Sequence, residues 1–291
     1  MQITRKRSFS ERAQGFVLLG HPLPVLFHAV AVTVFALLAA WSRPVWGTLL
    51  LVVGAHTAMQ LAIAVFNDYC DRERDAQVKS GKPISAGLVT PREALVVGGL
   101  LLLIMVLLLL PLPPLAWLLT LGYLALGMAY NLGLKATPLS GVVFALAMPL
   151  IPLYAFAGVG RWLPFLTWLL PMGALLGIAL NLANSLPDLE EDASSGARTL
   201  AVTLGLRRSF LLGNLLLMFD SLLLLVLDLT GFQRVQPLAL GLTLTLVGLL
   251  LALILLLTGA ERTRARRKLY FYLVTLACLV LAGGWLIGVL I

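Results

Sequence analysis

Two stretches of the sequence repeat one spacing of amide and carboxylate side chains. The first, NDYCDRERD, starts at residue 67, and the second, NSLPDLEED, starts at residue 184. A step of four residues advances an α-helix by about 400°, which is about 40° more than a full turn. Three side chains at this spacing therefore span only about 80° around the helix axis and form one stripe. The two stripes are Asn67, Asp71, Asp75 and Asn184, Asp188, Asp192.

These residue types point to metal-assisted chemistry on a phosphate. Carboxylate and amide oxygens suit Mg²⁺, which typically bridges a protein carboxylate to the phosphate oxygens of a substrate. Two facing stripes would hold a diphosphate through metal ions, and charge developing on a departing diphosphate would already be stabilised. Asp68 and Glu191 lie close to the stripes, and the nearby cations that could neutralise phosphate charge are Arg72, Arg74, Lys79, Lys82 and Arg198.

The elements that carry these stripes are expected to lie in a membrane. The chain has 291 residues, of which 60% are hydrophobic and 12% charged, and its mean hydropathy is +0.99. Nine apolar runs reach the roughly 20 residues needed to cross a bilayer, and they are too uniformly apolar for barrel strands. We therefore expect an all-α bundle of nine transmembrane helices, at about residues 22–41, 47–66, 93–111, 113–131, 138–158, 163–186, 209–229, 236–258 and 269–290.

The distribution of Lys and Arg predicts the orientation of this bundle. With the N-terminus in the cytoplasm, 18 of the 21 Lys and Arg residues fall on the cytoplasmic side. Both acidic motifs then open cytoplasmic loops, at about residues 67–92 and 187–208, so the site faces the cytoplasm, across the cytoplasmic membrane if the source is bacterial. The net charge of +8 lies in short breaks between apolar runs rather than on one basic face, which argues against a nucleic-acid partner. We interpret the run ERTRARRK, 261–268, as an anchor that binds anionic membrane lipid.

A diphosphate site at the end of an apolar bundle implies a substrate with a polar head and a long apolar tail. The tail would lie among the helices while the head stays at the interface. An allylic prenyl diphosphate has this shape, and a cavity without water would protect the carbocation formed when it ionises.

The motifs resemble those of the UbiA superfamily of intramembrane prenyltransferases. The resemblance rests on NDYCDRERD followed by GKPISAGLVT, on NSLPDLEED followed by GARTLAVTLG, and on the nine-span layout, so it covers nearly the whole chain. It implies one transmembrane prenyltransferase domain over residues 1–291 that uses Mg²⁺ to release diphosphate. The metal ligands that it implies are Asn67, Asp68, Asp71, Asp75, Asn184, Asp188 and Asp192. The catalytic residues would be Asp71, Asp188, Lys82 and Tyr130, and the substrate would be bound by Asn67, Asn184, Arg72, Lys79, Lys135 and Arg198.

Three positions depart from the pattern of the family. His21-Pro22 stands where many members have Arg-Pro, and Ala193 stands where many have a basic residue after the second motif. Pro187 directly precedes Asp188 and disfavours a helical turn at that point. We therefore expect a kink within the second stripe.

The acceptor of the prenyl group stays open at this stage. A quinone-precursor ring, a chlorophyllide, a glycerol phosphate ether precursor and a hydrocarbon all fit the family, and so does terpene cyclisation, in which no second substrate takes part. A secondary transporter is an alternative of another class, favoured only by Asp220 inside an apolar run. We interpret His28 and His56 as packed within the bundle, and the sequence implies no protein partner.

Overall fold

The computed structural model describes residues 8–41, 44–78, 81–258 and 263–290, and every regular element in these ranges is helical. The α-helices are α1 Phe9–Leu19, α2 Pro22–Ala39, α3 Trp46–Val78, α4 Pro91–Leu109, α5 Pro114–Asn131, α6 Ser140–Ala147, α7 Leu150–Gly158, α8 Leu169–Ser185, α9 Leu189–Ser194, α10 Leu200–Leu229, α11 Pro237–Thr258 and α12 Arg264–Leu290. Short 3₁₀ helices occur at Leu134–Ala136 (η1), Pro164–Trp168 (η2) and Leu186–Asp188 (η3). The all-α prediction is confirmed.

Each predicted apolar run corresponds to one helix or to two consecutive ones. The run at 138–158 divides into α6 and α7 at the turn Met148-Pro149, and the run at 163–186 begins with η2 before α8. Within the described ranges, eight helical segments are long and apolar enough to cross a membrane, and α5, with 18 residues, is not among them. The chain is thus a multi-pass membrane protein, and the number nine stays a prediction.

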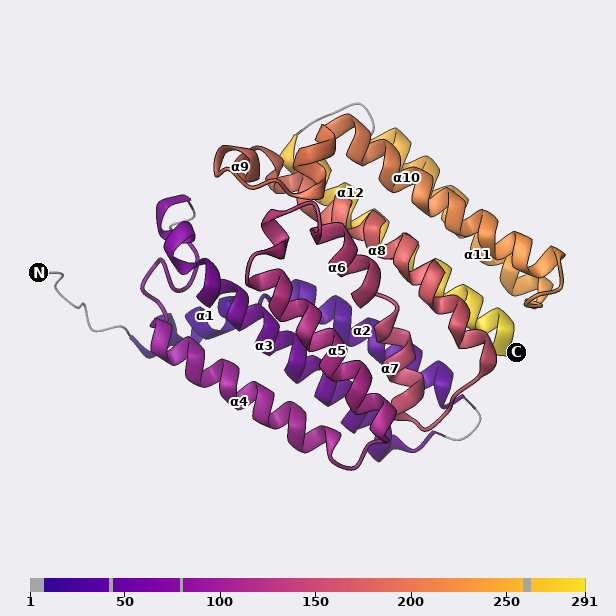
Figure 1. Cartoon of the computed structure of the whole chain (residues 1–291), viewed down its shortest axis with the longest axis horizontal. Coiled ribbons are helices and arrows are strands. Elements are labelled where there is room, and N and C mark those ends of the chain that lie inside the picture. Colours follow the sequence, from indigo (N-terminus) through magenta and orange to yellow (C-terminus); the bar gives the residue numbers. More distant parts are fainter. Residues whose placement is uncertain (1–7, 42–43, 79–80, 259–262, 291) are drawn as a thin grey trace, which may run out of the picture.

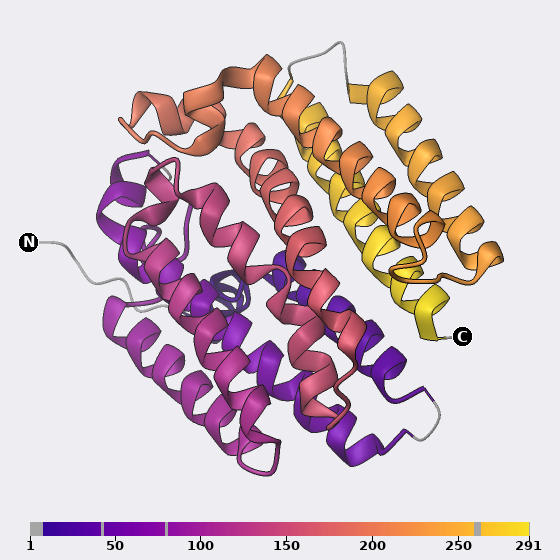
Figure 2. The same cartoon turned by 45° about the vertical axis from the view of Figure 1, so that its right-hand side comes forward.

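The helices form two packed groups around a shared interior. In the first group α3 packs against α2, α4 and α5, and in the second α8 packs against α10 and α12, with α11 against α12. Figures 1 and 2 show these groups side by side, with the broken pair α6 and α7 between them. α6 packs on α8, and α2 contacts both α7 and α12, so the two groups are joined on both sides of the interior.

Local sequence signals explain where several helices begin. Pro22, Pro91 and Pro114 occupy first helical positions, where the missing N–H would have no intrahelical acceptor. Thr90 caps α4 in a capping box, because its hydroxyl accepts from the Glu93 N–H while the Glu93 carboxylate accepts from the Thr90 N–H. These caps place the start of α4 next to the end of α3, where the first motif lies.

α1 is an element that the apolar runs did not predict. It begins with a capping box between Ser8 and Glu11. Its Leu19 is fully buried in a small core with Val65 and Val89, and Arg12 forms an ion pair with Glu93 at 2.8 Å. α1 therefore covers the end of the bundle where the first motif lies.

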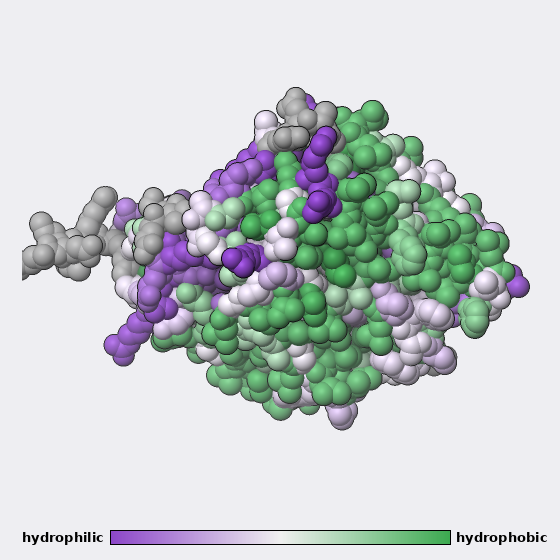
Figure 3. Space-filling view, turned by 45° about the horizontal axis from the view of Figure 1, so that its top comes forward, coloured by the Kyte–Doolittle hydropathy of each residue, from purple (hydrophilic) through white to green (hydrophobic). Residues whose placement is uncertain are grey.

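The two motifs differ in backbone although they share a spacing. The first lies on α3, which continues as a helix to Val78, well beyond the predicted loop boundary at residue 67. In the second, α8 ends at Ser185, and η3 separates it from α9, so the predicted kink at Pro187 is confirmed. Figure 1 places α9 and the end of α3 at the same end of the bundle. Figure 3 shows a largely hydrophobic face whose hydrophilic residues gather on one side.

Candidate active site

The first motif is built around a buried carboxylate. Asp68 is 1% exposed, and its Oδ1 lies 2.5 Å from Lys82 Nζ and 2.8 Å from His21 Nε2. Lys82 Nζ also lies 3.8 Å from Asp75 Oδ2. His21 reaches Asp68 from a left-handed backbone conformation with φ of 46°, a conformation that is unfavourable for a side chain of this size. The histidine that departs from the family pattern is thus part of the site.

Asp71 is held by a second lysine from a distant part of the chain. Lys135, in η1, places its Nζ 2.5 Å from Asp71 Oδ2, and Arg74 lies 3.6 Å from Asp71 Oδ1. Burial lowers the pKa of Lys135, and the hydrogen bond to Asp71 opposes that effect. The predicted substrate-binding Lys135 is therefore at the site, paired with a predicted metal ligand.

Asn67 is oriented by another asparagine. Its Nδ2 donates to Asn131 Oδ1 at 2.8 Å, and Asn131 Nδ2 donates to the Ile63 carbonyl at 2.9 Å. Because its own N–H group is used in this way, Asn67 keeps its side-chain oxygen as an acceptor toward the cavity. Asn131, which the sequence left without a role, is a positioning residue for the motif.

The second motif is held by α12. Arg264 places one guanidinium nitrogen 2.5 Å from Asp188 Oδ1 and the other 2.5 Å from Glu191 Oε1. Arg267 binds both oxygens of Glu190, at 2.6 and 2.8 Å, and donates to the Leu186 carbonyl at 3.2 Å. Instead of serving only as lipid anchors, two arginines of the run 261–268 hold the segment after the Pro187 kink. The sequence offered no signal for this pairing beyond a surplus of positive charge.

Replacing Arg264 with Gln is expected to reduce turnover about tenfold with little loss of stability. Arg264 is about half exposed, so its ion pairs contribute less than about 1 kcal/mol to folding. Its effect on Asp188 is geometric, and a carboxylate misplaced by about 1 Å costs catalysis far more than stability. The assay is steady-state turnover of the prenyl transfer that the resemblance in sequence implies, with Lys268→Gln as the control that removes one charge one turn further along α12. Equal effects of the two variants would contradict a positioning role.

One cavity of about 280 Å³ brings the two motifs together. Its lining includes Asn67 from the first motif, Asn184 from the second, and both His21 and Tyr130. The carboxylates of Asp71 and Asp192 interact electrostatically with the Tyr130 hydroxyl, so one acid from each motif lies near the cavity that Tyr130 lines. The cavity thus brings together Asn67 from α3, Tyr130 from α5 and Asn184 from α8.

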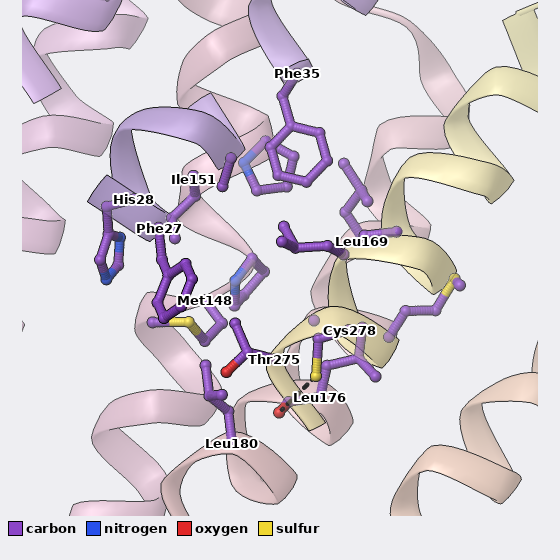
Figure 4. A pocket seen from close by; sticks show the side chains of 17 residues that line it. Phe27, His28, Phe35, Met148, Ile151, Leu169, Leu176, Leu180, Thr275 and Cys278 are labelled. Atoms are coloured by element: carbon purple, nitrogen blue, oxygen red, sulfur yellow. Dashed lines mark hydrogen bonds between the residues drawn. The ribbon is translucent and has the colours of Figure 1, made fainter. Parts of the chain in front are cut away.

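A second pocket of about 110 Å³ continues from the first into the apolar interior. The two share five lining residues, namely Phe27, His28, Met148, Leu180 and Thr275. Its remaining lining is largely hydrocarbon from α2, α7, α8 and α12 (Figure 4). The Cys278 thiol donates to the Leu176 carbonyl at 3.9 Å, the contact drawn as a dashed line in Figure 4. A polar mouth thus leads to an apolar channel.

Among the described residues, two predicted substrate-binding cations, Arg72 and Arg198, do not contact the predicted metal-ligand carboxylates. Arg72 donates to the Tyr69 carbonyl and to Glu73 and lies over the Tyr69 ring. Arg198 is exposed, and its backbone N–H donates to the Ala136 carbonyl, which joins the second loop to η1. Lys79 lies outside the described residues.

The donor set at the mouth fits Mg²⁺. Asp68 Oδ2 and Asp75 Oδ2 are buried oxygens without a hydrogen-bond partner in the described ranges. Those ranges contain no group of three His, Cys, Asp or Glu side chains close enough to enclose a metal ion. Mg²⁺ keeps several waters and is usually bound by one or two carboxylates, with substrate phosphate oxygens completing its shell, so the two buried oxygens of Asp68 and Asp75 suit it.

Comparison with known sequences decides the family. The sequence model of the UbiA prenyltransferase family matches residues 28–289. The chain belongs to the UbiA prenyltransferase family. A relative from Aeromonas hydrophila, named 4-hydroxybenzoate octaprenyltransferase, is 34% identical over 67% of this chain and 69% of its own length. One of the same name from Neisseria meningitidis is 35% identical over 50% of this chain and 51% of its own.

Solved structures show the same fold at low sequence identity. A structure of digeranylgeranylglyceryl phosphate synthase is 16% identical, with a TM-score of 0.72 over 96% of this chain and 99% of that one. A UbiA homologue from Archaeoglobus fulgidus, bound to GPP and Mg²⁺, is also 16% identical, with a TM-score of 0.67 over 93% and 98%. The UbiA fold therefore extends over nearly the whole chain.

Proposed function

We propose that this UbiA-family protein transfers a prenyl group from a prenyl diphosphate to a lipophilic acceptor, with Mg²⁺ as its metal. The observation that carries the proposal is a cavity lined by both Asn67 and Asn184 that continues into the apolar pocket. Such a cavity suits a molecule with an anionic head and a hydrocarbon tail. The relatives named as octaprenyltransferases and the homologue bound to GPP and Mg²⁺ support this assignment. We propose that residues 1–291 act as one transmembrane domain.

The two motifs would hold the metal and the diphosphate between them. We assign Asn67, Asp68, Asp71 and Asp75 to one side and Asn184, Asp188 and Asp192 to the other. Bound Mg²⁺ would supply positive charge to the diphosphate oxygens, which makes diphosphate a better leaving group. η3 breaks the second motif, so Asp188 does not continue the helix of α8, and Arg264 holds its carboxylate.

The lysines at the site have a role in the same step. Lys82 and Lys135 are paired with Asp68 and Asp71 in the described structure, so both ammonium groups are already held at the mouth. As the allylic C–O bond breaks, its electron pair goes to the diphosphate oxygen, and cations fixed nearby stabilise that charge without reorganising. The acceptor then forms a bond to the allylic carbon and loses a proton to water or to a carboxylate.

The apolar pocket would protect the reactive carbon. Its walls are mostly hydrocarbon, with His28, Thr275 and Cys278 as polar exceptions, so water would have little access to the allylic cation. Phe27 and Tyr130, which line the wider cavity, present aromatic faces that attract a cation. We propose that the mouth faces the cytoplasm, which the distribution of Lys and Arg supports.

The test is Mg²⁺-dependent release of diphosphate by the purified protein. A panel of prenyl diphosphates of different lengths is supplied with lipid extract as the source of acceptor. We expect release that EDTA abolishes and that excess Mg²⁺ restores. Release without any acceptor, together with a cyclic product, would mean a cyclase instead, and solute uptake into proteoliposomes without release would mean a transporter.

A further inference from the structure

The wall of the cavity carries a cluster of polar side chains deep between the helices. His28, Gln60 and Tyr123 line it from α2, α3 and α5. Gln60 Nε2 lies 3.1 Å from His28 Nδ1, and the Tyr123 hydroxyl interacts with the Gln60 side chain. The facing wall, from α6 and α8, is apolar and includes Val143, Ala147 and Leu180. Polar groups at this depth are costly and are commonly kept for function.

This cluster is separate from the diphosphate site. His28 lies on α2 seven residues after His21, the residue that caps this helix, and Gln60 precedes Asn67 on α3 by the same number. Seven residues correspond to about 10 Å along a helix axis. His28 and Gln60 thus lie at one level, below the level at which His21 and Asn67 face the mouth.

A second layer of side chains supports His28. The His56 ring lies 5.8 Å from the His28 ring, 5.5 Å from Tyr123 and 5.7 Å from Tyr154, measured between centroids. Tyr154 in turn donates to the Val52 carbonyl at 2.8 Å. His56 is 2% exposed, so it packs behind the wall and limits the positions open to His28.

The contact with Gln60 determines which nitrogen of His28 can donate. A Gln amide nitrogen can only donate, so His28 Nδ1 accepts and the ring proton of the neutral imidazole lies on Nε2. Within the described residues no protein group takes a hydrogen bond from that nitrogen. Figure 4 shows His28 beside Phe27 and Met148, away from Cys278 and Leu169 on the opposite side of the pocket. His28 therefore offers a neutral N–H donor where the two pockets meet.

We propose that His28 and Gln60 recognise the acceptor, with His28 Nε2–H donating to an uncharged hydroxyl or carbonyl oxygen on it. This inference rests on the proposed prenyl transfer. The prenyl tail is hydrocarbon and gains nothing from such a donor, whereas the apolar pocket suits it. The described residues that line the cavity include no Lys, Arg, Asp or Glu, so the wall beside His28 suits an uncharged oxygen, and a carboxylate elsewhere on the acceptor would lie outside this contact. Because Phe27 and Tyr123 line the same cavity, the acceptor class that fits is an aromatic ring with a phenol or quinone-type oxygen, rather than a plain hydrocarbon or a glycerol phosphate ether without a ring.

The inference is tested by measuring KM separately for the two substrates. The purified protein is assayed with Mg²⁺, a prenyl diphosphate and, in turn, 4-hydroxybenzoate, a dihydroxynaphthoate, a glycerol phosphate ether and an isoprenoid hydrocarbon as acceptor probes. His28→Phe and Gln60→Leu should each raise the acceptor KM at least tenfold and leave the KM for prenyl diphosphate within twofold. His28→Gln should recover much of the acceptor affinity, because its amide N–H lies near the position of Nε2.

Controls separate this role from packing and from the general proposal. Val30→Phe places the same aromatic ring on the exposed face of α2 and should change neither KM. An unchanged acceptor KM in both variants, or an equal rise for both substrates, would overturn acceptor recognition while leaving prenyl transfer in place. Efficient use of the hydrocarbon or the glycerol phosphate ether by the native protein would also overturn it. If the native protein prenylates none of the probes and releases no diphosphate, the proposed function itself fails.

Discussion

Turnover should fall at least about a thousandfold when Asp71 or Asp188 is replaced with Asn, while the protein stays folded. Each substitution keeps the size of the side chain and removes the charge that we assign to metal and diphosphate binding. Both residues lie at the mouth rather than in the apolar core, and Asp188 is only partly buried. Prenyl transfer and diphosphate release are measured with saturating Mg²⁺, and thermal unfolding reports on the fold.

Glu73→Gln is the matched control for Asp71→Asn. Glu73 lies on the same helix two residues away, and its side chain is 83% exposed and pairs only with Arg72 among the described contacts. We expect this variant to retain native turnover, because the carboxylate points away from the cavity. Native turnover by Asp71→Asn and Asp188→Asn would remove the metal-site assignment, and loss of activity in Glu73→Gln would show that general surface charge is responsible.

Replacing Lys82 with Met should reduce both turnover and stability. Lys82 is the ammonium group at 2.5 Å from Asp68, which is 1% exposed. Loss of this partner leaves a buried carboxylate with only His21 beside it, which should lower the free energy of unfolding by about 2 to 4 kcal/mol. Loss of a cation that stabilises the departing diphosphate should reduce kcat about a hundredfold.

A double substitution separates these two effects of Lys82. Lys82→Met together with Asp68→Asn removes the unpaired charge, so much of the lost stability should return. Turnover should not return, because the variant lacks both the cation and one carboxylate charge at the metal site. Recovery of activity together with stability would show that Lys82 has only a structural role. Denaturation midpoints and diphosphate release, measured on the same preparations, give the comparison.

The sequence by itself determined the class of fold and the residues of the motifs. Runs of about 20 apolar residues can satisfy their backbone only as helices in lipid, so the all-helical bundle followed directly. The four-residue spacing predicted a stripe, and α3 carries Asn67, Asp71 and Asp75 on one continuous helix. Pro187 predicted the kink, because proline disfavours a helical residue before it. Each of these features depends on residues that are close together in the chain, so the sequence alone is enough to predict it.

Two kinds of feature were not predicted from the sequence, namely a short helix without a long apolar run and the breaks inside apolar runs. α1 is short and amphipathic, and it is stabilised by its capping box and by packing against residues near 65 and 89. The breaks at Met148-Pro149 and at η2 lie inside apolar runs, where composition does not change. A hydropathy pattern reports the length of a span and says little about interruptions within it.

Only the tertiary structure decided which groups meet. Lys135 reaches Asp71 across 64 residues, and Arg264 reaches Asp188 across 76, whereas Arg72 next to Asp71 faces its own helix. Charge alone did not distinguish these cations in the sequence, because Coulomb attraction acts through space and the loops bring together residues that are distant in the chain. The same holds for His28, which the sequence predicted to be packed in the bundle and which the fold places on the cavity wall beside Gln60. A stripe needs only helical periodicity, but a pocket needs several helices to converge.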